Sequence, residues 1–182
     1  MKTVKILHGL ALFAFILAGA GCEQGVVRVC TWNATNLGWS FAADKDLGRM
    51  ARVIDDNCDV ASLQEVKNKD GVAKLLDALR ARSGSWDGTT TDKYYRSEYY
   101  GVVFRKEVAL QAEPRWRCPA GVDPAKDPRP ACGVLIRTNA GDNPFWLIGI
   151  HVLWSQTEAQ REQNIAALAP QIQGMLGNEA VQ

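Results

Sequence analysis

The sequence has little net charge of either sign. Its 182 residues include 21 Lys and Arg against 20 Asp and Glu, which gives a formal net charge of +1 at pH 7. A chain with this balance has no long-range positive field that would hold a polyanion non-specifically, so any phosphate chemistry must depend on a local site. The sequence also lacks internal repeats, and 47% of its residues are hydrophobic. These features exclude a disordered or fibrous protein and predict one globular domain with its own core.

No apolar run reaches the roughly 20 residues that a membrane-spanning helix needs. The run at residues 6–20 is shorter and rich in Gly and Ala, and two lysines precede it. We expect residues 1–21 to be a signal peptide, with a membrane anchor as the alternative, and residues 22–182 to form an exported domain. Residues 17–22 also resemble a bacterial lipoprotein cleavage site, which implies a lipid on Cys22 and a membrane tether. The expected location is periplasmic or outer-membrane, and otherwise secreted.

The sequence contains no C-x-x-C spacing, which argues against a zinc site or a redox centre. Apart from Cys22, four cysteines remain, an even number in a chain that we expect to reach an oxidising compartment. Cys118 and Cys132 flank a loop with four prolines. A disulfide closing this loop would restrict the unfolded chain by on the order of 3 kcal/mol, and we favour this pair. Cys30 and Cys58 lie in or beside strand-like segments, where they either pair or pack as small buried hydrophobic residues.

Hydrophobic periodicity predicts alternating strands and helices at the start of the chain and mainly strands after them. A strand at 26–32, a polar turn at 33–36, a helix at 44–56 and a strand at 59–65 follow one another. This order predicts a right-handed crossover whose two strands end at the same sheet edge, so Asn33 and Glu65 should meet. The other expected elements are a helix at 72–82, a loop at 83–94 and strands at 98–105, 107–112, 132–137 and 145–152. The last two strands are expected to form a hairpin. The final helix is expected to begin with a capping box at Thr157 and to be kinked at Pro170.

Three polar residues lie at or near the ends of apolar strands. Asn33 follows the first strand, Glu65 ends the second, and His151 lies in the last. An amide, a carboxylate and an imidazole at one cleft would suit metal-assisted phosphoryl transfer. Glu65 would hold a hard cation such as Mg2+, Asn33 would orient a water or a phosphate oxygen, and His151 would bind the phosphate or transfer a proton. Taken one by one, the same residues also fit a surface glutamate, a turn asparagine and a core histidine.

The sequence resembles the endonuclease/exonuclease/phosphatase superfamily, the deoxyribonuclease I-like proteins, in four stretches, which are, in chain order, VRVCTWNATNLGW, DVASLQEVKN, SEYYGVVFRKE and FWLIGIHVLW. The resemblance runs from about Val26 to the helix after Ser155. It implies an α/β fold, the four-layer α/β/β/α sandwich of that superfamily. It also implies a phosphodiester hydrolase that depends on Mg2+, with Mn2+ or Ca2+ as alternative cations, and that acts on nucleic acid.

The resemblance further implies roles for single residues. Asn33 matches the active-site asparagine of the first motif, and Glu65 matches the Mg2+ ligand, with Gln64 as its companion on the substrate side. His151 matches the histidine that acts on the scissile phosphate. Tyr99 resembles a tyrosine on the phosphate side of the site, although a packed strand tyrosine fits the same pattern.

Other family positions match less closely. Arg129 precedes a proline and resembles a phosphate-binding arginine of the family, with a different offset from the proline. The acidic residue that the family carries just before the SEYYG strand has no clear counterpart, and Asp92 is the nearest candidate.

The sequence also lacks two later motifs of the family, GDxN and SDH, and His151 is the single histidine outside the predicted signal peptide. Acid–base chemistry by two histidines cannot run on one imidazole. We therefore expect the chain to match the N-terminal portion of such an enzyme, with little or no turnover. A lipid or small-phosphoester phosphodiesterase or phosphatase is the alternative within the superfamily. A non-enzymatic, surface-tethered binding protein is the alternative from another class.

Overall fold

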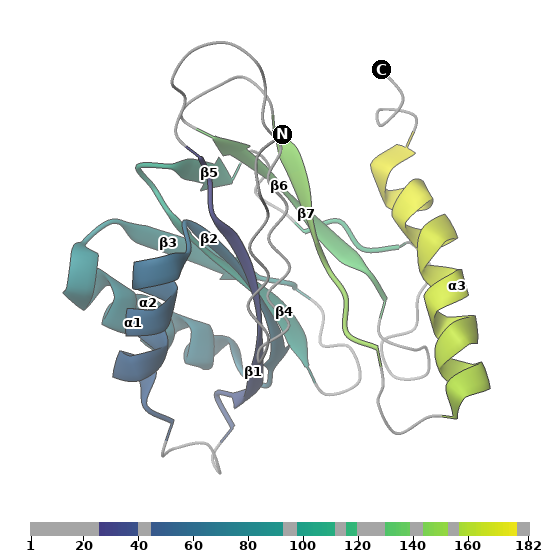
Figure 1. Ribbon diagram of the computed structural model, residues 1–182, viewed down its shortest axis with the longest axis horizontal. Coiled ribbons are helices and arrows are strands. Elements are labelled where there is room, and N and C mark those ends of the chain that lie inside the picture. The colour runs from purple at the N-terminus through teal and green to yellow at the C-terminus, as the bar shows by residue number, and fades with distance from the viewer. Residues whose placement is uncertain are drawn as a thin grey trace.

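The computed structural model describes residues 26–39, 45–92, 98–111, 116–119, 130–138, 144–152 and 157–177. These residues form two β-sheets that pack face to face, with helices outside them (Figure 1). The predicted signal peptide, Cys22 and Arg129 lie outside the described residues. No helix in the described ranges is long and apolar enough to cross a membrane.

The first sheet contains the crossover that the sequence predicts. Strand β1 (Val29–Leu37) runs parallel to β2 (Val60–Val66), and α1 (Leu47–Asn57) lies between them in the chain. After β2 come α2 (Lys69–Ser83), β3 (Trp86–Thr90) and β4 (Tyr99–Arg105), and the strand order in the sheet is β1-β2-β4-β3. Both β1 and β2 therefore end at the same edge of the sheet.

Helices α1 and α2 cover the outer face of this sheet (Figure 1). Their apolar stripes pack on the β2 and β4 side chains that point the same way, and this core includes Ile54, Leu63, Leu75, Leu79 and Val103. Both helices begin at a side-chain cap, because Asp46 accepts a hydrogen bond from the Arg49 amide and Asn68 accepts one from the Asp70 amide. Helix α2 thus starts just after β2 ends, whereas a longer connection joins β1 to α1.

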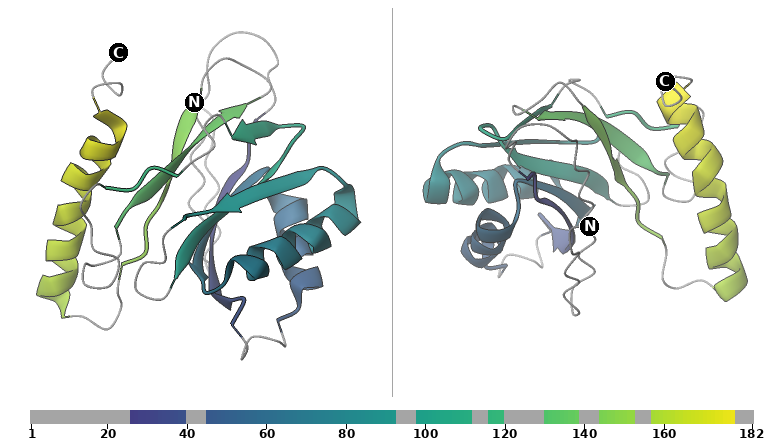
Figure 2. Two further views of the ribbon diagram at one scale, coloured as in Figure 1. Left: turned by 180° about the vertical axis from the view of Figure 1, so that it is seen from behind. Right: turned by 45° about the horizontal axis from the view of Figure 1, so that its top comes forward.

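The second sheet is antiparallel, with the order β5-β6-β7, made of β5 (Ala109–Gln111), β6 (Cys132–Thr138) and β7 (Phe145–Gly149). Its inner face packs on the first sheet through Ala109, Val134 and Ile136, which meet Val102 and Phe104. Helix α3 (Glu158–Leu176) lies beside this sheet, on the side of the molecule away from α1 and α2 (Figure 2). The order of layers is helices, sheet, sheet and helix, which is the four-layer arrangement expected.

Three local predictions are wrong, and one concerns His151: β7 ends at Gly149, so the histidine follows the last strand and does not lie in it. Strand β3 lies inside the segment expected to be a loop, because Gly88 allows its backbone to approach β4 closely: a Cβ there would lie 2.4 Å from the Val102 carbonyl oxygen. Strand β1 also continues through the expected turn at 33–36. The hairpin partners β6 and β7 pair as expected. The capping box at Thr157 is present, and Pro170 lies inside α3.

Two disulfides hold the described chain together. One joins Cys118 to Cys132, the pair that the proline-rich loop favours. The other joins Cys30 of β1 to Cys58, which follows α1. The sequence left this second pair open. It ties the strand that carries Asn33 to the end of the helix that packs on it.

An ionic cluster closes the opposite end of the first sheet from Asn33. The Arg105 guanidinium lies 2.7 Å from Asp55 and 3.7 Å from Asp59, and the Trp86 indole donates a hydrogen bond to Asp55. Arg28 donates to Asp59 from its backbone and its side chain. Burial alone would raise the pKa of Asp55 and of Asp59, but these hydrogen bonds and charges hold both pKa values below their usual range.

Candidate functional site

The site begins with two irregularities at the ends of β1 and β2. Between these strands the register passes from Asn33–Gln64 to Leu37–Val66, so β1 carries extra residues. A second register shift interrupts the pairing of β2 with β4 between Leu63 and Val66. Bulges of this kind turn a side chain away from its regular direction. Here they turn the residues that follow Asn33 and Gln64.

Backbone strain is concentrated at the same place. Three non-glycine residues in the described ranges have positive φ angles, and all three lie in these bulges: Thr35 at 44°, Asn36 at 64° and Glu65 at 57°. A residue with a side chain pays roughly 1–3 kcal/mol to adopt such a conformation, and strained residues cluster at functional sites. Because Glu65 has this conformation, its carboxylate points out of the regular strand pattern, toward Asn33.

Asn33 and Glu65 are joined directly, as the sequence predicts. The Asn33 Nδ2 donates a hydrogen bond of 2.8 Å to Glu65 Oε1. The amide oxygen of Asn33 accepts a hydrogen bond of 2.9 Å from the backbone of Thr35, which fixes the orientation of the amide. The Glu65 side chain is 22% exposed. It is therefore both held in place and open to a ligand.

His151 completes the group from the second sheet, two residues after β7 ends. Its Nε2 lies 3.6 Å from Glu65 Oε1, and its Nδ1 lies 2.7 Å from Oε1 of Glu98. In the tautomer that carries its proton on Nδ1, this nitrogen donates the hydrogen bond to Glu98, and Nε2 faces Glu65. The structure thus brings Asn33, Glu65 and His151 to one place.

The acidic residue before β4 is Glu98, which was not recognised in the sequence analysis. Asp92, the candidate named there, is exposed. Glu98 is 1% exposed and directly precedes β4. The strand alternates, so Glu98 is in phase with Tyr100 and Val102, which face the second sheet. A carboxylate on the same strand face as buried apolar residues needs a partner. Its place in the alternation of the strand is therefore the sequence signal that could have identified Glu98.

Two lysines bring positive charge to the site. The Lys67 Nζ lies 3.9 Å from Oε2 of Glu98, on the other side of that carboxylate from His151. Lys45 donates a hydrogen bond to the backbone carbonyl of Ala34. Burial lowers the pKa of Lys45, and the nearby charge of Glu65 opposes that shift. The two cations would offset part of the charge of an anionic ligand at Glu65.

Gln64 and Tyr99 do not join this group in the same way. The Gln64 Nε2 donates hydrogen bonds to the hydroxyls of Thr31 and Ser62, where it helps hold β1 to β2. Tyr99 lies on the other face of β4, packed against the helix-side core, with the Lys69 ammonium 5.3 Å from its ring centre. Contact of either residue with a substrate stays a prediction.

The donor set at Glu65 suits some metal ions better than others. No group of three or more His, Cys, Asp and Glu in the described ranges is placed to hold a metal ion. Mg2+ keeps several waters and is often held by one or two carboxylates together with substrate phosphates. The single open carboxylate of Glu65, beside the oriented amide of Asn33, fits that pattern.

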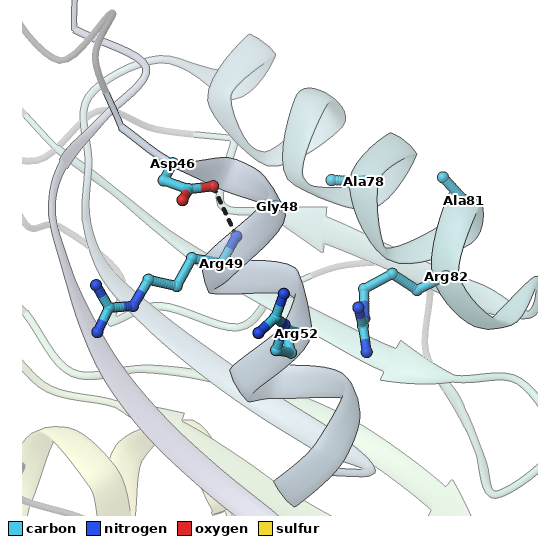
Figure 3. Close-up of a pocket in the computed structure, with 7 residues that line it drawn as sticks. All are labelled: Asp46, Gly48, Arg49, Arg52, Ala78, Ala81 and Arg82. Carbon is cyan, nitrogen blue, oxygen red and sulfur yellow. Dashed lines mark hydrogen bonds between the residues drawn. The ribbon is translucent and has the colours of Figure 1, made fainter.

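A shallow pocket elsewhere is separate from this site. It lies on the outer helices and is lined by residues of α1, of α2 and of the α1 cap, including Arg49, Arg52 and Arg82 (Figure 3). Asn33, Glu65 and His151 are not among its lining residues. Arg82 is paired there with Asp55 and Asp56.

Comparison with known proteins identifies the fold. No known protein-family model matches the chain. A curated protein named deoxyribonuclease, from Thioalkalivibrio sp. (strain K90mix), is 27% identical over 147 residues, which cover 78% of this chain and 39% of that protein. A crystal structure of an endonuclease/exonuclease/phosphatase family protein from Bacteroides thetaiotaomicron is 12% identical with a TM-score of 0.60, and the match covers 84% of this chain and 59% of that one.

A third match is the structure of D. rerio TDP2 complexed with a single-strand DNA product. It is 16% identical with a TM-score of 0.56, and the match covers 81% of this chain and 54% of that one. The chain thus spans less than two thirds of the length of each of these proteins. Within that span, its described residues adopt the fold of the endonuclease/exonuclease/phosphatase proteins, the deoxyribonuclease I-like fold.

Proposed function

We propose that this chain carries the metal-binding site of a Mg2+-dependent phosphodiester hydrolase that acts on nucleic acid. The observation that carries the proposal is the position of Glu65, which accepts a hydrogen bond from Asn33 and lies 3.6 Å from Nε2 of His151. A hard carboxylate and an imidazole at this separation can serve one phosphate group. The curated relative named deoxyribonuclease and the TDP2 structure with single-strand DNA support nucleic acid as the substrate.

Each residue has a distinct part in this proposal. Glu65 would hold the cation, and Asn33 keeps the Glu65 carboxylate oriented. When bound, Mg2+ would supply positive charge that polarises the phosphate. His151 would exchange a proton at Nε2 with the phosphate or with a water beside it, while Glu98 holds the proton on Nδ1. Lys45 and Lys67 would lower the cost of bringing the phosphate anion next to two carboxylates.

Nicking of supercoiled plasmid tests the proposal. We expect slow nicking by the 182-residue chain that requires Mg2+ and stops with EDTA, because the sequence lacks the GDxN and SDH motifs. Glu65→Gln should reduce the rate by about 10²-fold or more. The matched control is Glu158→Gln, which changes an exposed glutamate on α3 and should leave the rate unchanged. Nicking that persists at full rate in Glu65→Gln would refute the proposal.

The same preparation distinguishes the alternatives. Sphingomyelin, a phosphoinositide and a sugar phosphate are offered under the plasmid conditions. Faster Mg2+-dependent turnover of one of these than of plasmid would assign the site to a lipid or small phosphoester. If the chain neither cleaves nor binds any of these substrates or plasmid, a binding protein without phosphodiester chemistry becomes the better explanation.

Export and lipid attachment at Cys22 form a separate proposal, which rests on residues 1–22 alone. Mass spectrometry of the N-terminus of the purified protein tests it. A lipid-modified Cys22 supports the tether, and an unmodified residue ahead of Cys22 contradicts it.

A further inference from the structure

An exposed tryptophan lies at the end of β1, next to the site. Trp39 is 49% exposed and is one of the few large hydrophobic residues in the described ranges that remain open to water. It follows the strained bulge that turns Asn36 and its neighbours. Tryptophan is enriched where proteins meet their ligands, because its ring is apolar and its N–H can still form a hydrogen bond.

The backbone that carries Trp39 is held firmly. Gly38 has a φ of 86°, and a Cβ on it would lie 2.9 Å from atoms of Asn68. The amide of Lys67 donates a hydrogen bond of 2.8 Å to the Leu37 carbonyl, and the amide of Trp39 donates one of 3.1 Å to Asn36. The segment just before Trp39 is thereby fixed to the segment that follows β2. The backbone that carries the ring is therefore pre-organised and loses little freedom when a ligand binds.

A chain of contacts leads from this ring to the imidazole of the site. The Lys67 Nζ lies 5.7 Å from the centre of the Trp39 ring, within range of a cation–π contact. The same ammonium lies 3.9 Å from Glu98, the carboxylate that holds His151. The Trp39 ring and the carboxylate that holds His151 therefore both contact the same ammonium. A nucleotide bound at this ammonium could place its phosphate toward the Glu98–His151 pair and its base toward the Trp39 ring.

We propose that Trp39 is a stacking platform for an unpaired base beside the phosphate at Glu65, and that it directs the site to single-stranded nucleic acid. This inference rests on the proposed function and specifies its substrate. A base stacks on an indole only when its face is accessible, which favours single strands over duplex. Stacking is tolerant of base identity, so the platform would contribute affinity without selecting a sequence.

Binding of two matched oligomers tests the role of Trp39. One is a fluorescently labelled single-stranded oligodeoxynucleotide, and the other has the same sugar–phosphate backbone with abasic sites in place of all bases. Fluorescence anisotropy with the 182-residue chain is measured in Mg2+, because the proposed phosphate site at Glu65 needs the cation, and it is read before the slow cleavage proceeds. We expect the base-carrying oligomer to bind the wild type about 5- to 100-fold more tightly than the abasic one.

Variants then locate this preference. Trp39→Ala should lose most of the preference for bases while it binds the abasic oligomer as the wild type does, and Trp39→Phe should keep part of the preference. Ile165→Ala is the matched control, because Ile165 is 56% exposed on α3 and outside the site, and it should change neither affinity. Equal melting temperatures of the variants would show that the comparison is between folded proteins.

The possible outcomes separate this inference from the proposed function. If the wild type binds both oligomers equally and still nicks plasmid through Glu65, stacking is refuted and the function stands. If Trp39→Ala weakens binding of both oligomers to the same degree, Trp39 supports the fold and the platform is also refuted. If the wild type binds neither oligomer and does not nick plasmid, both proposals fail.

Discussion

Glu98 and His151 meet across the two sheets although 53 residues separate them in the chain. The Nδ1 atom of His151 lies 2.7 Å from Oε1 of Glu98, and Glu98 is 1% exposed. Glu98 directly precedes β4 of the first sheet, and His151 follows β7 of the second. The imidazole at the site is thus oriented by a buried carboxylate from the opposite layer.

This pair leads to a prediction for Glu98→Gln. The glutamine cannot stabilise a positive imidazole as a carboxylate does, and it can hold the other tautomer, so proton exchange at Nε2 should be impaired. We expect the rate of plasmid cleavage at saturating substrate to fall by about 10²-fold, with little change in KM. The measurement is steady-state cleavage with plasmid in excess over protein at a series of plasmid concentrations, with Glu158→Gln as the control. A rise in KM at an unchanged rate would show that Glu98 acts on binding instead.

The positive φ of Glu65 leads to a prediction about stability. At ordinary strand positions, glycine is less stable than alanine by roughly 0.5–1 kcal/mol. At φ 57° the order should reverse, because only glycine adopts this conformation without strain. We expect Glu65→Gly to exceed Glu65→Ala by about 1 kcal/mol in free energy of unfolding, measured by urea denaturation. Both variants lose the hydrogen bond from Asn33, so the difference between their free energies of unfolding reports the backbone conformation at position 65 alone.

The control for this comparison is Arg137, an exposed residue of β6 whose φ is not positive. There, the alanine variant should be the more stable of the pair. If alanine is also the more stable residue at position 65, the bulge is not strained.

The Cys30–Cys58 disulfide should contribute strongly to stability. It closes a loop of 28 residues between β1 and the end of α1. Loop-closure entropy alone gives about 3.5 kcal/mol for a loop of this length. We expect the double variant Cys30→Ala, Cys58→Ala to lose about 2–4 kcal/mol in free energy of unfolding. A loss below about 1 kcal/mol would show that α1 and β1 are held together mainly by their apolar contacts.

The buried carboxylate of Asp59 should make stability depend on pH. Burial opposes its ionisation, but hydrogen bonds from Arg28 hold its pKa below the ordinary value of 3.8. A folded-state pKa below that of the unfolded chain contributes stability above about pH 3.8, and this contribution is lost as the pH falls through the folded value. We expect Asp59→Asn to cost about 1.5–3 kcal/mol at pH 7 and much less near pH 2.

Urea denaturation at pH 7, 5, 3 and 2 measures this difference. The control is Asp77→Asn, because Asp77 is 76% exposed and its contact with Arg80 lies on the surface. That variant should change stability by less than about 1 kcal/mol at every pH. A cost for Asp59→Asn that stays constant down to pH 2 would contradict a role for the ionised carboxylate.

The local part of the site could be predicted from the sequence. Asn33 and Glu65 end neighbouring strands of one crossover unit, and the geometry of that unit is the same wherever it occurs. Their contact therefore follows from the order of strand, helix and strand. The bulge that strains Glu65 could not be predicted, because its residues carry no glycine at the strained positions.

The long-range part could not be predicted in the same way. Glu98 contacts His151 only because the second sheet packs on the first, and no local pattern sets that register. Strand β3 was missed for a related reason. Its residues after Trp86 are small or polar, and the strand forms because β4 supplies its backbone partners.

The assembly of the site from two sheets has a consequence for how the protein can fail. Glu65 belongs to the half that α1 and α2 shield, whereas His151 arrives with the other half. Solvent conditions or substitutions that weaken the apolar contacts between the two sheets at Val102 and Val134 would separate Glu65 from His151. Each sheet would still keep its secondary structure. The far-ultraviolet circular dichroism spectrum would then be unchanged, although Glu65 and His151 no longer lie close together.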